Sequence, residues 1–242
     1  MLTHIRTEGD LDAALAALTR ADARFAALIA RAGRPPLRRR PDGFAGLVAT
    51  VVSQQLSTAS AGAIWARLAG AFDPFEPQAI MRARVSKLAR LGLSAPKIRA
   101  LKEIARAVAS ERLALSSLAA MQAEAAHAAL TAVHGIGPWT ADIYLLSCLG
   151  HADAWPAGDL ALQEAARLAF ALRQRPSAKE MMALAETWRP LRAVAARVLW
   201  TYYRHHRQSR GSLPTNHAIK RETKGASRNG EQPGGVKITS KA

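Results

Sequence analysis

Residues 131–142 read Thr-Ala-Val-His-Gly-Ile-Gly-Pro-Trp-Thr-Ala-Asp, and this stretch decides the fold. Gly135 and Gly137 can adopt positive φ without steric cost, so the chain can reverse tightly around Ile136, which we expect to be buried. The proline that follows suits the first position of a helix. The stretch therefore predicts a hairpin between two helices within residues 122–149, with free N–H groups at the start of the second helix facing outward, where a phosphate can bind.

A turn with two glycines also joins packed helices that bind nothing, so the hairpin alone leaves this alternative open. A second motif, Trp-Pro-Ala-Gly-Asp at residues 155–159, brings a carboxylate to the start of another predicted helix. Aspartate is a favoured N-cap residue, and a cap also fixes the orientation of its carboxylate. Asp159 is therefore a candidate functional residue, and the alternative is a cap with a structural role alone.

The hairpin and Asp159 together resemble the helix-hairpin-helix DNA glycosylase superfamily, and specifically its DNA-3-methyladenine glycosylase II (AlkA-type) branch. Three further stretches resemble this branch in the same order: Ser-Gln-Gln-Leu-Ser at 53–57, Gly-Leu-Ser-Ala-Pro-Lys at 92–97 and Trp-Arg-Pro at 188–190. The resemblance covers about residues 10–205. It implies an all-α fold of two helical subdomains with the active-site cleft between them, without the N-terminal β-containing domain of longer relatives.

Composition agrees with a helical protein that binds a polyanion. Hydrophobic residues make up 49% of the 242 residues, enough for a real core, and alanine and leucine dominate over β-branched and aromatic residues. The net charge of +16 favours nucleic acid as a partner. The single cysteine excludes a disulfide framework within the chain and a four-cysteine iron–sulfur cluster. We expect no metal and no cofactor, although backbone carbonyls of the hairpin can hold a monovalent cation.

Charge divides the chain at about residue 206. Residues 1–206 form the predicted glycosylase domain, whereas from residue 204 onward nine Lys and Arg stand against two Asp and Glu. This composition predicts a basic, disordered tail over 207–242. The N-terminus has no signal-like apolar segment and no run of 18 apolar residues occurs, so we expect a monomeric, cytoplasmic, nucleoid-associated protein that does not bind membranes.

The resemblance implies a base-excision repair reaction on double-stranded DNA that contains damaged bases. An alkylated purine, of the 3-methyladenine or 7-methylguanine type, is flipped out of the duplex and its N-glycosidic bond is hydrolysed, which leaves an abasic site. Asp159 would stabilise the positive charge that develops on the sugar and orient or deprotonate the attacking water. Asp153 is the nearest rival, but it lies off the position that the family uses.

Aromatic residues are the predicted walls of the base pocket. Trp139 and Trp200 present electron-rich rings, which attract an alkylated purine because such a base carries positive charge. By resemblance, Gln54 faces the pocket, and Tyr144 lies beside the position at which relatives carry a tyrosine. The alternative is that these tryptophans are core residues, as tryptophans on helices more often are.

The predicted DNA contacts begin with the loop after Gln54, where the family inserts a wedge into the gap left by the flipped nucleotide. Either Gln55 or Leu56 occupies this position. The remaining predicted contacts lie in the hairpin and in the helix before it: His134, Gly135, Gly137, Thr140 and Lys97. Alternatives stay open, since amides at helix ends can serve backbone groups, Lys97 can be an ordinary surface lysine, and the basic run 38–40 can be a solvated face.

Three functions compete on these observations. The first is a monofunctional glycosylase, the second is a helix-hairpin-helix module that holds DNA without chemistry, and the third is a glycosylase that also cleaves the strand. A pure binder needs no carboxylate beside an aromatic pocket. A lyase of this superfamily carries a lysine at the start of the second hairpin helix, and here that residue is Trp139. The sequence therefore favours the monofunctional glycosylase.

Overall fold

The computed structural model describes residues 2–211, and within them the chain is helical without a β-strand. The all-α prediction is confirmed. The described helices are α1 (Glu8–Ala21), α2 (Arg24–Ala32), α3 (Gly43–Ser53), α4 (Thr58–Gly70), α5 (Pro77–Arg82), α6 (Val85–Arg90), α7 (Ala95–Ala109), α8 (Ala123–Thr131), α9 (Pro138–Tyr144), α10 (Leu160–Ala169), α11 (Ala178–Ala185) and α12 (Arg192–Gly211). Short turns of 3-10 helix are η1 (Leu118–Ala120) and η3 (Glu186–Trp188), and a π-helical turn, η2 (Leu145–Leu149), continues α9.

Contacts divide the chain into the units Met1–Arg204 and His205–Ala242, and the candidate site lies within the first. The basic tail predicted over 207–242 begins inside α12, and from residue 212 it lies outside the described residues. Among the described helices, none is long and apolar enough to cross a bilayer.

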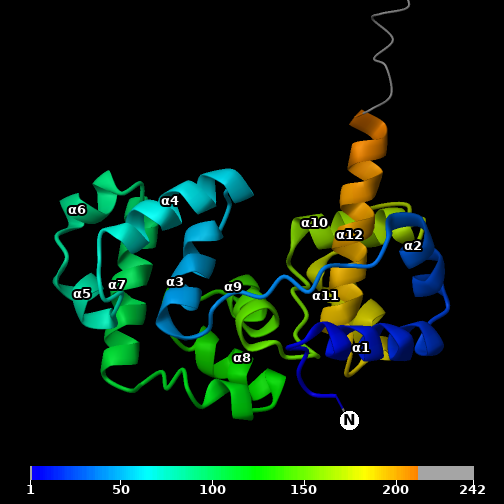
Figure 1. Cartoon of the computed structure of the whole chain (residues 1–242), viewed down its shortest axis with the longest axis horizontal. Coiled ribbons are helices and arrows are strands. Elements are labelled where there is room, and N and C mark those ends of the chain that lie inside the picture. The colour runs from blue at the N-terminus through cyan, green and yellow to red at the C-terminus, as the bar shows by residue number, and fades with distance from the viewer. Residues whose placement is uncertain (1, 212–242) are drawn as a thin grey trace, which may run out of the picture. The chain divides into compact units, whose positions relative to one another are not determined.

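Within the first unit, the helices form two groups joined by the hairpin. Figure 1 shows α3 to α7 gathered on one side, α1, α2, α10, α11 and the first turns of α12 on the other, and α8 and α9 between them. Helix α3 packs against α4, α7 and α9, and α8 packs against α9. The two groups correspond to the two predicted subdomains.

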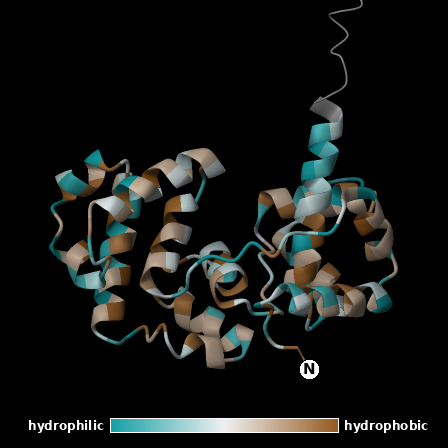
Figure 2. Ribbon diagram, viewed as in Figure 1, coloured by the Kyte–Doolittle hydropathy of each residue, from teal (hydrophilic) through white to brown (hydrophobic). Residues whose placement is uncertain are grey.

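Helix α7 shows how the sequence builds this unit. It begins after Ser94 with Pro96 in its first turn, where the missing proline N–H removes no helical bond. Leu101 and Ile104 on α7 and Leu47 on α3 are fully buried, and each contributes about 1.5–3 kcal/mol by leaving water. Figure 2 shows hydrophobic and hydrophilic positions interspersed along such helices, while the last described turns of α12 are mainly hydrophilic. The buried face of α7 therefore anchors the hairpin and α3, which carry site residues.

Candidate active site

The predicted hairpin is present, and its two glycines act differently. Gly135 has a φ of +96°, and a Cβ there would lie 2.5 Å from the Cβ of Ala100 on α7, so glycine is needed for both the turn and the packing. Ile136 is 3% exposed, as predicted. Gly137 has a φ of −82° and is the N-cap of α9, so it does not use the left-handed region. A Cβ at Gly137 would meet nothing within 4 Å, which leaves the chain open to close approach there.

Asp159 is the N-cap of α10, as predicted. Its Oδ1 accepts a hydrogen bond from the backbone N–H of Leu162 at 2.7 Å. The loop before it is compact, because the N–H of Asp159 donates to the carbonyl of Pro156 at 2.9 Å and residues 154–157 are buried. The cap therefore presents a partly exposed carboxylate from a buried loop.

Both predicted pocket tryptophans contact this carboxylate. The indole N–H of Trp139, on α9, donates to Asp159 Oδ2 at 2.8 Å, and that of Trp200, on α12, donates to Oδ1 at 3.2 Å. Both rings are half-buried, and their predicted contact with a base stays a prediction. A carboxylate offers about four lone-pair positions. The two indoles and Leu162 use three, so Oδ2 can accept one more donor, such as a water molecule beside a reacting sugar.

Hydrogen bonds to α9, α10 and α11 hold the 155–159 loop in place. The indole N–H of Trp155 donates to the carbonyl of Met181 at 3.1 Å, and the amide of buried Gln163 donates to the carbonyl of Ala157 at 2.9 Å. The carboxyl group of Asp142, on α9, accepts the backbone N–H of Trp155, and burial raises its pKa to about 8. These contacts fix the loop on which Asp159 sits.

Asp153, the nearest rival to Asp159, is part of an ion-pair cluster. Its carboxylate accepts hydrogen bonds from Arg189 at 2.6 Å and from Arg192 at 2.7 and 2.8 Å. Both arginines also bind Glu124 on α8. This cluster ties the segment before the loop to α8 and to the start of α12, which gives Asp153 a structural role.

Gln54 and Thr140 contact each other across 86 positions of sequence. The side-chain amide of Gln54 donates to Thr140 Oγ1 at 2.6 Å. Thr140 is only 1% exposed, so the structure corrects its predicted role as a DNA contact: its hydroxyl is an internal acceptor that orients Gln54. Gln54 itself is half-buried at the end of α3, close to the start of α9, and its contact with a base stays a prediction.

Tyr144 is not part of a pocket. Its side chain is fully buried, its hydroxyl donates to the carbonyl of Gly43 at 3.4 Å, and burial raises its pKa. The structure thus corrects the prediction that Tyr144 binds substrate, because packing against α3 leaves no surface for a ligand. The tyrosine lies on the face of α9 that packs against α3.

The loop between α3 and α4 presents the two predicted wedge residues. Gln55 is exposed with a left-handed φ of +55°, which is uncommon for a residue other than glycine, and Leu56 is 39% exposed. Ser57 then caps α4 by accepting the N–H of Ser60 at 3.2 Å. His134 is likewise exposed, in the hairpin. The DNA contacts of these residues stay predictions.

The side chain of Lys97 binds backbone carbonyls of the protein, whereas the sequence predicts that it binds a DNA phosphate. Its Nζ donates to the carbonyls of Val52 at 2.7 Å and Gln54 at 2.8 Å, and burial lowers its pKa. The ammonium therefore caps the end of α3. The predicted phosphate contact requires this amine to turn away from two short hydrogen bonds, so the structure does not support it.

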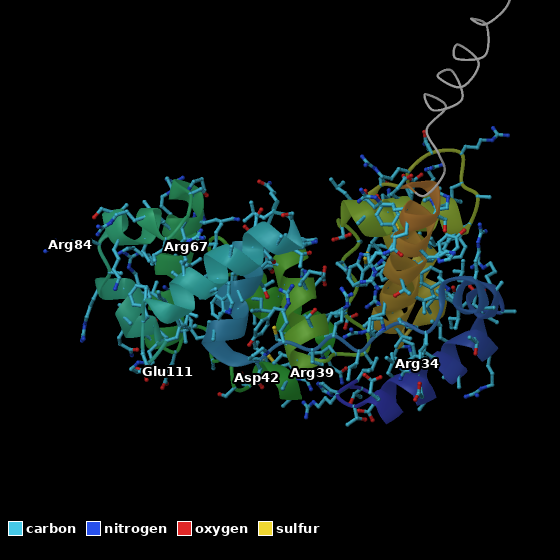
Figure 3. All side chains as sticks on the ribbon, turned by 45° about the horizontal axis from the view of Figure 1, so that its top comes forward. Arg34, Arg39, Asp42, Arg67, Arg84 and Glu111 are labelled. Carbon is cyan, nitrogen blue, oxygen red and sulfur yellow. The ribbon has the colours of Figure 1, made fainter. Side chains whose placement is uncertain are left out.

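The basic run 38–40 lies on the connector between α2 and α3, where Figure 3 labels Arg39 and Asp42. The guanidinium of Arg39 donates to the carbonyl of Cys148 at 2.5 Å, and the N–H of Arg40 donates to Ser147 at 2.9 Å. Both acceptors belong to η2. At least part of this run therefore serves to attach the connector to the hairpin.

The arrangement described above agrees with the similarity of this chain to known proteins. The family described as "HhH-GPD superfamily base excision DNA repair protein" matches residues 48–190, a range that includes the hairpin and Asp159. The chain belongs to the HhH-GPD superfamily. The alkylbase DNA glycosidase-like protein mag2 of Schizosaccharomyces pombe is 27% identical over 79% of this chain and 93% of its own length. The chain spans 55% and 57% of two curated relatives from Bacillus subtilis.

Solved structures of HhH-GPD proteins give the same result. The 3-methyladenine DNA glycosylase Mag1 of Schizosaccharomyces pombe, solved with abasic DNA, superposes with a TM-score of 0.70 at 28% identity, over 77% of this chain and 94% of that one. A DNA-3-methyladenine glycosidase from Bacillus halodurans gives 0.68 at 30% identity, over 79% and 89%. The HhH-GPD fold predicted from the motifs is confirmed.

The sequence analysis did not single out Asp142 as a site residue, and it gave Lys97 a different role. Asp142 follows Trp139 by three positions, a spacing that puts both on one side of a helix, so the signal was present. The capping role of Lys97 had no local signal, because its acceptors lie more than 40 residues earlier.

Proposed function

We propose that this chain is a monofunctional DNA glycosylase that hydrolyses the N-glycosidic bond of alkylated purines in double-stranded DNA and leaves an abasic site. One observation carries the proposal: the carboxylate of Asp159 is held by two indole N–H groups and one backbone N–H. Relatives named 3-methyladenine DNA glycosylases support the class of substrate.

The reaction follows from what this carboxylate can do. A purine enclosed in a duplex is out of reach, so the nucleotide is flipped toward Asp159. As the base leaves, the sugar becomes an oxocarbenium-like cation, and a fixed negative charge beside it lowers the energy of the transition state. The accepting position that remains on Oδ2 orients the water that attacks the sugar. Trp139 and Trp200 supply ring faces for a cationic base.

Strand cleavage is not part of this proposal. It needs an amine that attacks the sugar to form a Schiff base, and Trp139 occupies the position of the lyase lysine. The half-buried amine of Lys97, which lies at the end of α3 beside the wedge loop, is bonded to two carbonyls. Water is therefore the nucleophile, and the DNA strand stays intact.

A non-catalytic DNA-binding module is the alternative. Such a module needs the hairpin to bind DNA. It does not need a helix-capping carboxylate that accepts hydrogen bonds from two tryptophans. Since all these groups come from one chain and act on DNA, we propose that the protein works as a monomer in the cytoplasm, at the nucleoid.

The test is incubation with duplexes that contain 3-methyladenine, 7-methylguanine or hypoxanthine, with an undamaged duplex of the same sequence as control. We expect free alkylated base, detected by mass spectrometry, and an intact abasic strand. Binding without release of any base would overturn the proposal in favour of the DNA-binding module. A covalent adduct that borohydride traps in step with excision would instead establish a lyase.

A further inference from the structure

The wedge loop is attached to the protein through Lys97. This lysine lies in the first turn of α7, and its ammonium reaches the carbonyls of Val52 and Gln54 at the end of α3, at 2.7 and 2.8 Å. The last carbonyls of a helix lack partners within the helix and carry its negative dipole end, so a cation there is favourable. Lys97 thereby fixes the point at which the chain leaves α3.

A second contact holds the same residue from the other side. The backbone carbonyl of Gln54 accepts from Lys97, while its side-chain amide donates to the buried hydroxyl of Thr140 at 2.6 Å. Beyond Gln54, the left-handed Gln55 and the exposed Leu56 are free of such contacts with α7 or α9 in the described part of the chain. The segment that carries the two exposed residues is therefore fixed at Gln54 on its α3 side, while Ser57 fixes it on the α4 side.

We propose that Lys97 is a positioning residue for the DNA wedge: with Thr140, it fixes Gln54 so that Gln55 and Leu56 point in the direction that enters the duplex when a nucleotide is flipped. The proposal rests on the proposed glycosylase function. Lys97 acts on the distortion of the DNA, whereas Asp159 acts on the glycosidic bond.

The chain provides a matched control on the same helix. Lys102, five residues after Lys97, is also half-buried, and its Nζ donates to the carbonyls of Met81 at 3.1 Å and Ala83 at 2.7 Å. It thus caps the end of α5 as Lys97 caps the end of α3. No predicted site residue follows α5. The two lysines therefore have the same structural role, but only Lys97 caps a helix that leads into predicted DNA contacts.

The experiment compares Lys97→Met with Lys102→Met, because methionine keeps an unbranched chain and removes the charge. Urea unfolding should show similar losses of stability. Affinity for a duplex with an abasic site, and the fluorescence of 2-aminopurine beside that site, report wedge insertion. We expect Lys97→Met to bind the abasic duplex about tenfold more weakly than Lys102→Met. Lys97→Arg should recover most of this loss, and Thr140→Val should show a smaller loss of the same kind.

Two outcomes would overturn the proposal. Equal abasic-site binding and equal fluorescence in the two lysine variants would leave Lys97 with a structural role only. A direct phosphate contact would weaken binding to undamaged and abasic duplexes alike and would lower the salt slope by about one, whereas positioning leaves the slope unchanged. These measurements need no base excision, so they stay informative even if the wild-type protein releases no base.

Discussion

The two loops that the hairpin helix α9 contacts are built in opposite ways. The 155–159 loop is buried through residue 157, and its terminal carboxylate accepts three N–H groups from α9, α10 and α12. The 54–57 loop is held where it leaves α3 and where Ser57 caps α4, and Gln55 and Leu56 between these points are exposed. The 155–159 loop is thus fixed along its length, whereas the 54–57 loop is fixed at its two ends.

This difference matches two chemical tasks. A group that stabilises developing charge is most effective when it is already oriented, because no free energy is then spent on reorganisation during the reaction. A group that fills a gap in a base stack must reach out of the protein, so it has to be exposed in the free state. Helix α9 contacts both loops, because Trp139 is bonded to Asp159 and Thr140 is bonded to Gln54.

Removing the negative charge of Asp159 should slow base excision more than any of the changes that follow. Asp159→Asn should lower single-turnover excision on the order of 1,000-fold or more, because it removes the negative charge at nearly constant shape. Asparagine is also a good N-cap, so the melting temperature should change by only a few degrees. Its amide must meet the Trp139 N–H, however, and abasic-DNA affinity should be measured in parallel. Excision near the wild-type rate would assign the chemistry to another residue.

A smaller effect should follow from removing one donor at a time. Trp139→Phe and Trp200→Phe keep an aromatic face for the base and delete only an N–H to Asp159. A hydrogen bond to a charged group is worth about 1.5–3 kcal/mol, so each variant should slow excision at saturating enzyme by about tenfold or more. The effect of Trp139→Phe should be the larger, since its bond is 2.8 Å against 3.2 Å. Equal excision rates in both variants and the wild type would show that the indole N–H groups do not contribute to excision, so that only the ring faces of the tryptophans could act.

Much of this architecture was predictable because its signals are local. The Gly135 turn and the Asp159 cap each depend on residues within four positions of one another, and the structure confirms both. Composition and the family resemblance also indicated the all-α class. The resemblance placed Asp159 and Trp139 in one site, and the two side chains are hydrogen-bonded to each other.

The errors concern side chains whose surroundings come from distant parts of the chain. Tyr144 and Thr140 were predicted to face ligands, but both turn into the contact between α9 and α3, which no local pattern encodes. Lys97 was predicted to contact a phosphate, with an ordinary surface lysine as the alternative, yet its ammonium binds two carbonyls at the end of α3. Sequence reasoning thus located the elements of the site and failed on which face of each helix packs.

The stability of the 155–159 loop should depend on pH through one buried carboxyl group. The fixed loop depends on Asp142, whose side chain is 15% exposed and lies 3.8 Å from His127 Nε2 on α8, with the charge of Arg192 nearby. Burial raises the pKa of Asp142 from 3.8 to about 8, so the folded protein keeps this carboxyl protonated at a pH where the unfolded chain ionises it. The folded state then binds one more proton, and its stability falls as the pH rises toward 8. Burial lowers the pKa of His127 below 6.5, so this histidine is neutral above pH 7.

Asp142→Asn should therefore remove a pH dependence while keeping the bond to the loop. An asparagine oxygen can still accept the Trp155 N–H, but the side chain cannot ionise. Between pH 7 and 8 the wild-type free energy of unfolding should fall with a slope of up to about 1.4 kcal/mol per pH unit, and the variant should show a flatter profile and higher stability at pH 9. Urea unfolding at half-unit steps of pH measures both.

Asp153→Asn is the control, because it leaves buried Arg192 without its closest partner and should lose stability throughout this range. Parallel wild-type and Asp142→Asn profiles would show that Asp142 is ionised in the folded protein, and the fixed loop would then be held by a charge.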